Sequence, residues 1–281
     1  MNEALVRRRK ALDQFVVAVA MIMTVLALAW LFLILWGLLV NGINAINLGL
    51  FTETTPPPGS KGGLNNAIIG SLMLTAVAMA IALPIGILAG TYLSEYGRQS
   101  KLSEVIRFVN DILLSAPSIL IGLFVYAVAI APANHFSGWA GSLALAIIAI
   151  PILVRTTENM LRLVPDQMRE AATAIGAPKW KVTLSVVQRA AFQGILTGIL
   201  LALARVSGET APLIFTAFGN QFLSYDMSGP IASLPVVIYK FALSPYADWR
   251  QIAWGGAFLI TATVLILNII SRLFSPEKGR V

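Results

Sequence analysis

Long apolar stretches, separated by short polar or charged segments, dominate the chain. About 20 helical residues cross the ~30 Å hydrocarbon core of a bilayer. Six stretches are long enough to form such helices. Only the fifth of them contains charged residues. We therefore expect six transmembrane helices, at residues 15–40, 67–93, 112–131, 138–154, 190–217 and 251–271. This pattern predicts an all-α polytopic membrane protein with one transmembrane domain over residues 1–281.

The third and fourth helices come from one charge-free run, residues 112–154, which is too long for a single span. The segment Pro132–Gly138 is rich in turn-forming residues and divides the run in two. Pro117 predicts a kink within the third helix, and Ser118 could bond the carbonyl that the proline leaves free. Pathway lining and ordinary packing both remain open for these two residues. Asp111, at the inner end of this helix, is expected to be an interfacial carboxylate.

The distribution of Lys and Arg predicts the orientation of the chain. Short loops that carry these residues stay on the cytoplasmic side. If both termini are cytoplasmic, that side holds sixteen basic residues and the outer side holds three. We therefore expect cytoplasmic N- and C-termini, and a cytoplasmic loop at residues 155–189 between the fourth and fifth helices.

Composition excludes several classes of protein. The 281 residues are 57% hydrophobic and 12% charged, with a mean hydropathy of +0.80, which excludes a soluble globule and a disordered chain. The net charge of +7 lies on the cytoplasmic side, so it indicates orientation and contact with membrane lipid, not nucleic acid. The chain has no cysteine and a single histidine, His135, in an outer turn. We expect no metal site and no enzymatic nucleophile–base set.

The cytoplasmic loop contains a short predicted helix. Pro165 suits its first position, and Gly176 suits a left-handed C-cap. Between them an apolar stripe follows the helical spacing i, i+3, i+4, i+7. Its members are Met168, Ala171, Ala172 and Ile175. The stripe could lie against the chain's own membrane helices, or it could enter a groove of a cytoplasmic partner.

Arg205 and Glu209 lie inside the fifth apolar stretch. A charge near the bilayer centre costs about 2.5–3.5 kcal/mol on insertion scales, so both side chains should face protein or water. Their i, i+4 spacing allows an ion pair, although Arg before Glu is the weaker order. Arginine presents a planar fork that suits carboxylate or phosphate. We expect an anion to displace Glu209 from Arg205 during transport; the alternative is a purely structural ion pair.

The cytoplasmic loop resembles that of a known family. Glu170, Ala171 and Ala172, followed by Gly176, are similar to the "EAA…G" loop of ABC-importer permeases, which docks into a cleft of the ATPase subunit. Residues 187–189 depart from the Leu-Pro with which that loop often ends. The chain has no glycine-rich phosphate loop. The resemblance therefore implies that ATP and Mg are bound by a partner ATPase and that this chain binds no cofactor itself.

Residues 204–216 resemble the "AR..GETAPL.FT" segment of phosphate ABC-importer permeases of the PstA type. Further matching stretches are residues 64–68, 87–96 and 116–123. The resemblance implies a type I importer fold in the bacterial inner membrane, with Arg205 and Glu209 in phosphate passage. It also implies a sister permease (PstC type), a homodimeric ATPase (PstB type) and a periplasmic phosphate-binding protein (PstS type). A sulfate or phosphonate importer, and more remotely an ion-coupled secondary anion transporter, are the alternatives.

Overall fold

The computed structural model describes residues 3–274, and the regular structure within that range is helical. In chain order the elements are α1 (Glu3–Ala45), α2 (Leu48–Thr52), α3 (Asn65–Thr91), the π-helical η1 (Tyr92–Tyr96), α4 (Lys101–Ser115), α5 (Ser118–Val125), the π-helical η2 (Tyr126–Ile130), α6 (Ala131–Ala133), α7 (Gly138–Arg162), α8 (Asp166–Ala174), α9 (Lys179–Val182), the π-helical η3 (Thr183–Val187), α10 (Gln188–Ser207), α11 (Ala211–Thr216), α12 (Leu234–Ala242) and α13 (Ala247–Phe274).

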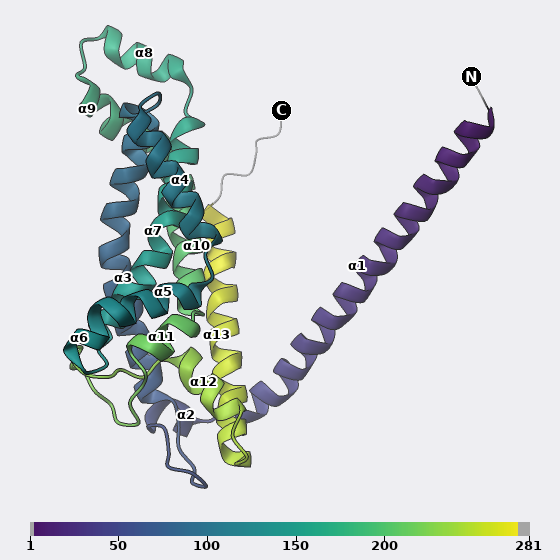
Figure 1. Ribbon diagram of the computed structural model, residues 1–281, viewed down its shortest axis with the longest axis vertical. Coiled ribbons are helices and arrows are strands. Elements are labelled where there is room, and N and C mark those ends of the chain that lie inside the picture. The colour runs from purple at the N-terminus through teal and green to yellow at the C-terminus, as the bar shows by residue number, and fades with distance from the viewer. Residues whose placement is uncertain (1–2, 275–281) are drawn as a thin grey trace.

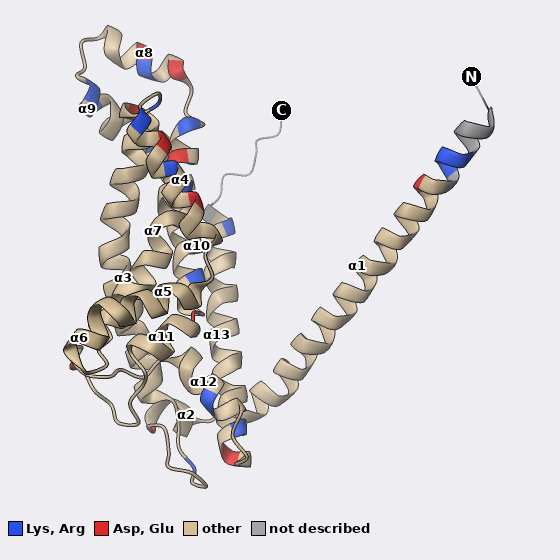
Figure 2. Ribbon diagram, in the orientation of Figure 1, with Lys and Arg blue, Asp and Glu red and all other residues tan. Residues whose placement is uncertain are grey.

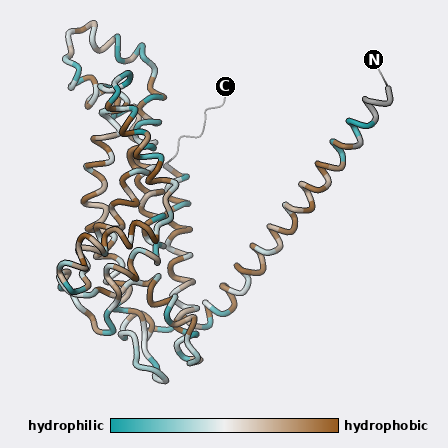
Figure 3. Tube along the Cα trace, viewed as in Figure 1, coloured by the Kyte–Doolittle hydropathy of each residue, from teal (hydrophilic) through white to brown (hydrophobic). Residues whose placement is uncertain are grey.

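The long helices α3, α7, α10 and α13 form a bundle, and α1 diverges from it (Figure 1). Five helical stretches are long and apolar enough to cross a membrane, and α4 with α5 forms a sixth, bent candidate. Hydrophobic residues run along the long helices, whereas the end that carries α8 and α9 is more hydrophilic (Figure 3). The prediction of an all-α polytopic membrane protein is confirmed.

Small residues allow α3 and α7 to approach closely, which makes this the most extensive helix contact in the bundle. A Cβ atom added to Gly90 would lie 2.7 Å from Cβ of Thr157 and 2.8 Å from the carbonyl oxygen of Val154. Gly86, one turn earlier, faces Leu153 in the same way. Small-xxx-small spacing of this kind is typical of tightly packed membrane helices.

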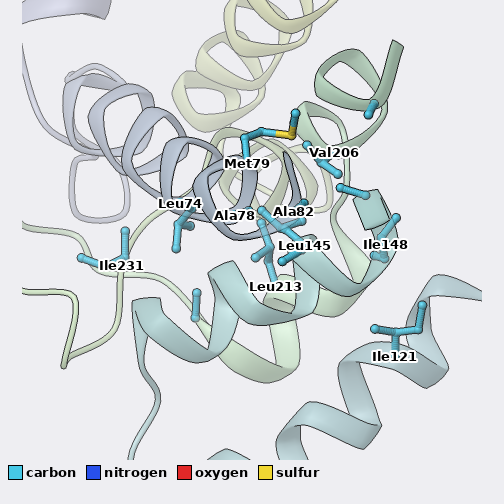
Figure 4. Close-up of a cluster of buried hydrophobic side chains, with 14 of the residues drawn as sticks. Leu74, Ala78, Met79, Ala82, Ile121, Leu145, Ile148, Val206, Leu213 and Ile231 are labelled. Carbon is cyan, nitrogen blue, oxygen red and sulfur yellow. The ribbon is translucent and has the colours of Figure 1, made fainter. Parts of the chain in front are cut away.

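A buried apolar cluster surrounds this contact and joins α3 and α7 to α5, α10 and α11 (Figure 4). Its members include Leu74 and Ala78 of α3, Leu145 of α7, Val206 of α10 and Leu213 of α11. The cluster holds the short helices against the bundle at the level where α10 ends.

The third membrane crossing differs from the expected single helix at residues 112–131. It begins at Lys101, where the Ser100 hydroxyl accepts a hydrogen bond from the backbone N–H of Ser103. It breaks between Ser115 and Ser118, and α4 and the stretch that follows are bent by 104°. Pro117 cannot donate a backbone hydrogen bond and forces the preceding residue into an extended conformation, so a full break replaces a kink.

The fifth crossing also differs from the expected range of 190–217. Helix α10 ends at Ser207, and the separate α11 begins only at Ala211. Helix α11 packs on α5, where a Cβ atom on Gly122 would lie 2.6 Å from Cα of Pro212. The two interrupted crossings therefore support each other.

Helices extend beyond the apolar stretches at the end of the bundle that carries α8 and α9. The helix of the fourth crossing continues to Arg162, and the helical stretch that leads into the fifth begins at Lys179, with the separate helix α8 between them. The segment that connects these two long helices is therefore shorter than the expected 155–189. Ion pairs accompany the extension: Glu158 binds both Arg107 and Arg162, at 2.8 and 2.6 Å. The hydropathy pattern shows where charged residues begin along the chain. Ion pairs between those residues allow the helix to continue beyond that point.

At the opposite end, α12 is a short helix whose buried residues include Val236 and Phe241. It packs on α13 and α3, as expected for a segment too short to be a seventh span. The buried amide of Asn66 ties the nearby loop down by donating to the carbonyl oxygens of Asn220 and Gln221, at 2.7 and 3.1 Å.

Candidate functional site

Arg205 and Glu209 form an ion pair where α10 ends. Nη2 of Arg205 lies 3.1 Å from Oε1 of Glu209, as the i, i+4 spacing predicts. Arg205 occupies the last turn of α10, whereas Glu209 follows the C-cap residue Gly208. The Arg205 side chain is 61% exposed and the Glu209 side chain 9%. The carboxylate is therefore fixed within the protein, and the guanidinium faces an open surface.

This arrangement leaves the guanidinium able to bind a second anion. Arginine has five N–H donors, and the ion pair with Glu209 involves only the Nη2 side of the guanidinium. Because the guanidinium is 61% exposed, an incoming oxyanion can reach it beside the carboxylate. A displaced Glu209, however, would be a buried carboxylate without its cation, which is unfavourable. The geometry thus favours reversible capture of an anion over permanent binding.

A groove of about 520 Å³ lies between α7 and α10, toward the end of the bundle that carries α8. Its polar lining consists of Thr156, Gln193 and Thr197, and it extends to Pro165, the N-cap residue of α8. Gln193 and Thr197 are four residues apart on α10 and share one face of that helix, and Arg205 lies in its last turn. The groove therefore lies along the helix that carries Arg205.

Pro117 and Ser118 lie at the break between α4 and α5. The hydroxyl that bonds carbonyl oxygens near this break belongs to Ser115, which donates to Asp111 at 2.8 Å and to Ile112 at 3.1 Å. Neither of these is the carbonyl freed by Pro117, which the sequence suggested as a partner for Ser118. Because α5 packs on α11, the broken segment contacts the element that follows Glu209.

Asp111 has a partner that the sequence did not indicate. Its carboxylate lies 3.6 Å from Nη1 of Arg155, whereas the nearby Arg107 binds Glu158. His135 lies in an exposed turn, with Nδ1 3.3 Å from the carbonyl oxygen of Phe136. Within residues 3–274, no cluster of three or more His, Asp or Glu side chains is arranged to hold a metal ion.

Helix α8 presents the apolar stripe expected in the cytoplasmic loop. It has no buried residue, and Ile175, which follows it, is 86% exposed. Met168 is exposed and Ala172 partly buried. Pro165 is the N-cap residue of α8, whereas the sequence predicted it at the first helical position. Gly176 has the predicted positive φ, +83°. The stripe of Met168, Ala171, Ala172 and Ile175, with Glu170 beside it, is therefore open to a partner.

Two backbone hydrogen bonds end α8 at this glycine. The N–H of Gly176 donates to Thr173 at 2.9 Å, and that of Ala177 donates to Ala172 at 3.2 Å. This pattern is a Schellman motif, which requires the left-handed conformation that glycine adopts most readily.

Sequence reasoning missed the residue that attaches α8 to the bundle. Arg169 of α8 binds Glu95 of η1 with two hydrogen bonds, Nη2 to Oε1 at 2.7 Å and Nε to Oε2 at 3.1 Å. The side chains are 13% and 6% exposed. The hydrogen bond with Glu95 raises the pKa of Arg169 above its usual value. The only signal in the sequence was the charge of Glu95 at the end of an apolar run. The pairing itself could not be predicted, because Glu95 and Arg169 lie 74 residues apart.

Comparisons with known proteins agree with this architecture. The family model described as "Binding-protein-dependent transport system inner membrane component" matches residues 82–279. The chain is 56% identical to the phosphate transport system permease protein PstA of Pasteurella multocida, over 97% of both chains. It is also 56% identical to that of Haemophilus influenzae, over 96% of both. With PstA 1 of Mycobacterium tuberculosis H37Rv, identity is 36%, covering 90% of this chain and 82% of that protein.

Solved structures show the same fold at low sequence identity. A bacterial alginate ABC transporter chain superposes with a TM-score of 0.67 at 13% identity, over 94% of both chains. The MetNI methionine ABC transporter gives 0.57 at 18% identity, over 75% of this chain and 94% of that one. These likenesses concern the helical arrangement only.

Proposed function

Because this chain belongs to the binding-protein-dependent inner-membrane permeases, and within them to the PstA-type phosphate permeases, we propose that Arg205 and Glu209 form its phosphate-transfer site. The chain is a multi-pass inner-membrane subunit of an ATP-driven importer and provides a translocation pathway for inorganic phosphate. The observation that carries the proposed site is the ion pair of an exposed guanidinium with a buried carboxylate.

Phosphate transfer at this site proceeds by exchange of anions. Phosphate offers more oxygens and more negative charge than a single carboxylate, so it displaces Glu209 from the Arg205 guanidinium. Glu209 is then left without its cation in a largely buried position. When the helices move and the phosphate contacts weaken, Glu209 pairs with Arg205 again and releases the anion toward the cytoplasm. The groove between α7 and α10, which carries the polar side chains of Gln193 and Thr197, lies in that direction.

Helix α8 is the proposed docking element for the ATPase. Its apolar stripe is exposed, and small side chains at Ala171 and Ala172 permit close approach of a cleft. An ATPase partner and a substrate-binding protein follow from the family in general terms. The finer assignment is a homodimeric PstB-type ATPase that binds ATP and Mg, a PstS-type periplasmic phosphate-binding protein and a PstC-type sister permease. The sister permease covers the exposed side of α10 and completes the anion site.

The proposed orientation places both termini in the cytoplasm. Lys and Arg gather around α4, α8 and α9, at one end of the bundle (Figure 2). The N-terminal part of α1 extends toward the same end and carries Arg8, Arg9 and Lys10 (Figure 1). The positive-inside rule assigns this end to the cytoplasm. Helix α8 then faces the compartment that holds ATP.

The direct test replaces Arg205 in the complete transporter. The complex of both permeases, ATPase and binding protein is reconstituted in proteoliposomes, and ATP-driven entry of labelled phosphate is measured. Arg205→Gln is expected to reduce uptake at least about tenfold, because a neutral amide cannot replace a charged bidentate donor. Arg205→Lys should give intermediate uptake, since it keeps the charge but loses the planar fork.

Arg250→Gln is the matched control. Arg250 is also exposed, but its Nη1 donates to the carbonyl oxygens of Ser244 and Pro245 near the outer end. Co-purification of the subunits verifies assembly for each variant. Normal phosphate uptake by an assembled Arg205→Gln complex would refute the proposed site. ATP-independent phosphate entry through this chain alone would instead favour the secondary-transporter alternative.

A further inference from the structure

The attachment of α8 to the bundle depends on one side chain. We infer that Arg169 is a positioning residue that transmits movement of the docked ATPase from α8 to α3 and α7. This inference rests on the proposed docking of the ATPase on α8. The contacts of Arg169 with Glu95, Leu161, Val164 and Asp166 are named here the Arg169 clamp.

The clamp uses every N–H donor of the guanidinium. Nε donates to Glu95, and Nη2 donates to Glu95 and to the carbonyl oxygen of Leu161, the latter at 2.8 Å. Nη1 donates to the carbonyl oxygen of Val164 at 2.6 Å and to Asp166 at 3.1 Å. Each of the five N–H donors of Arg169 therefore has an acceptor. Lysine has only three donors and no planar fork, so it cannot reproduce this set.

The acceptors belong to different parts of the chain. Glu95 lies at the cytoplasmic end of α3, in η1, while Leu161 is in the last turn of α7 and Val164 follows it. The carbonyl oxygen of Leu161 also accepts from the backbone N–H of Val164, at 3.3 Å, and Arg169 adds a second, shorter hydrogen bond to it. A single side chain of α8 thus binds the ends of both helices that form the closest pair in the bundle.

The other attachments of α8 are weaker. The helix buries no residue of its own, and Arg169 and Ala172 are its only members that are not fully exposed. A second ion pair, Arg98 Nη2 to Asp166 Oδ1 at 3.3 Å, has side chains that are 46% and 63% exposed. Solvent competes with such an exposed pair, whereas the pair of Arg169 with Glu95 is largely shielded. Without Arg169, α8 can pivot on its two connecting segments.

Movement of the clamp reaches the anion site through helix packing. Helices α3 and α7 are in contact at Gly86 and Gly90, so they move together. Helix α7 packs on α10 at Gly194 and at Gly198, where an added Cβ atom would lie 2.5 Å from Oγ1 of Thr156. Helix α10 carries Arg205. The route from α8 to Arg205 therefore consists of one ion-pair cluster and two close helix contacts.

The first test measures phosphate transported per ATP hydrolysed by the reconstituted complex. Arg169→Met is expected to lower uptake at least about tenfold while ATP hydrolysis per assembled complex changes less than about twofold. Arg169→Lys should recover part of the ratio, because it keeps one charge contact with Glu95. The control Arg98→Met removes the same charge from the exposed pair and should leave the ratio within about twofold of the parent. A loss of positioning changes this ratio, whereas a loss of folding lowers both rates with the yield of complex.

The second test examines α8 directly and does not depend on the transported ion. The chain has no cysteine, so Lys101→Cys and Ala174→Cys provide two unique spin-label sites, on α4 and α8. The distance distribution between the labels in the complex should be narrow in the parent and in Arg98→Met, and distinctly broader in Arg169→Met and Glu95→Gln. The double variant Arg169→Met, Glu95→Gln should be no broader than Arg169→Met alone, because that single variant already removes the contact with Glu95.

An unchanged distance distribution in Arg169→Met would overturn the inference, as would a parental ratio of phosphate to ATP. A proportional fall in both rates would also overturn it. If the parent complex takes up no phosphate, the proposed function fails instead, and the distance measurement still decides the role of Arg169.

Discussion

Gly90 provides the most direct test of the packing that joins α3 to α7. In Gly90→Ala, the new Cβ atom would approach Cβ of Thr157 to 2.7 Å and the carbonyl oxygen of Val154 to 2.8 Å. Ordinary contacts begin at 3.4 Å, and a backbone carbonyl within a helix cannot rotate away. The helices must therefore separate by about 0.6–0.7 Å around this point, which removes a quarter or more of the dispersion energy of the affected contacts.

The size of the effect follows from two opposing contributions. Overpacking of this kind costs about 1–3 kcal/mol, and a backbone contact places the cost near the upper limit. Alanine recovers up to about 1 kcal/mol through its better helix propensity. A net loss of about 2 kcal/mol corresponds to a melting temperature lower by about 4–8 °C for a domain of this size.

The assay is thermal unfolding of the detergent-solubilised complex, followed by the intrinsic fluorescence of tryptophan at one fixed heating rate. Gly37→Ala is the matched control, because a Cβ atom on Gly37 meets nothing within 4 Å in the exposed part of α1. We expect the control to melt with the parent or slightly above it. Equal melting temperatures for Gly90→Ala and Gly37→Ala would refute the argument that steric contact between α3 and α7 determines the loss.

Two further predictions concern the end of the bundle that carries α12. Asn66→Leu removes the donor to the carbonyl oxygens of Asn220 and Gln221, which costs about 1–3 kcal/mol for each group left unpaired. Hydrogen exchange should therefore accelerate in residues 217–222 and stay constant in α8. Unchanged exchange in that loop would contradict this account. Burial lowers the pKa of Lys240, whose Nζ donates to the carbonyl oxygen of Phe218 at 3.0 Å. Its neutral amine therefore forms at lower pH, and acetylation followed by mass spectrometry should show a midpoint below 10.5; a midpoint at or above that value would contradict the shift.

Several local features were predictable because neighbouring residues alone produce them. Pro117 interrupts the third crossing, and Gly176 ends α8 in a left-handed conformation, since each acts through its own backbone. The pairing of Arg205 with Glu209 was predictable for the same reason, because four residues along a helix bring two side chains together.

The extent of each helix was less predictable. Hydropathy placed the start of the third crossing near Ile112, but α4 begins at Lys101 and includes charged residues. Arg107 is accommodated because it reaches the buried Glu158 of α7, at 2.8 Å. A hydropathy pattern cannot show that an ion pair compensates the charge of Arg107, since its partner Glu158 lies 51 residues further along the chain.

The sequence by itself determined that this protein is helical and lies in a membrane, because an apolar segment in lipid must satisfy its backbone hydrogen bonds internally. It also indicated that Pro117 disturbs the third crossing and that Arg205 and Glu209, the residues of the proposed anion site, can pair. Only the tertiary structure decided that Glu209 is buried while Arg205 is exposed, and that Arg169 binds Glu95. The physical reason is that burial and long-range pairing depend on which helix ends meet in space, and packing of Gly86 and Gly90 against α7 sets that arrangement.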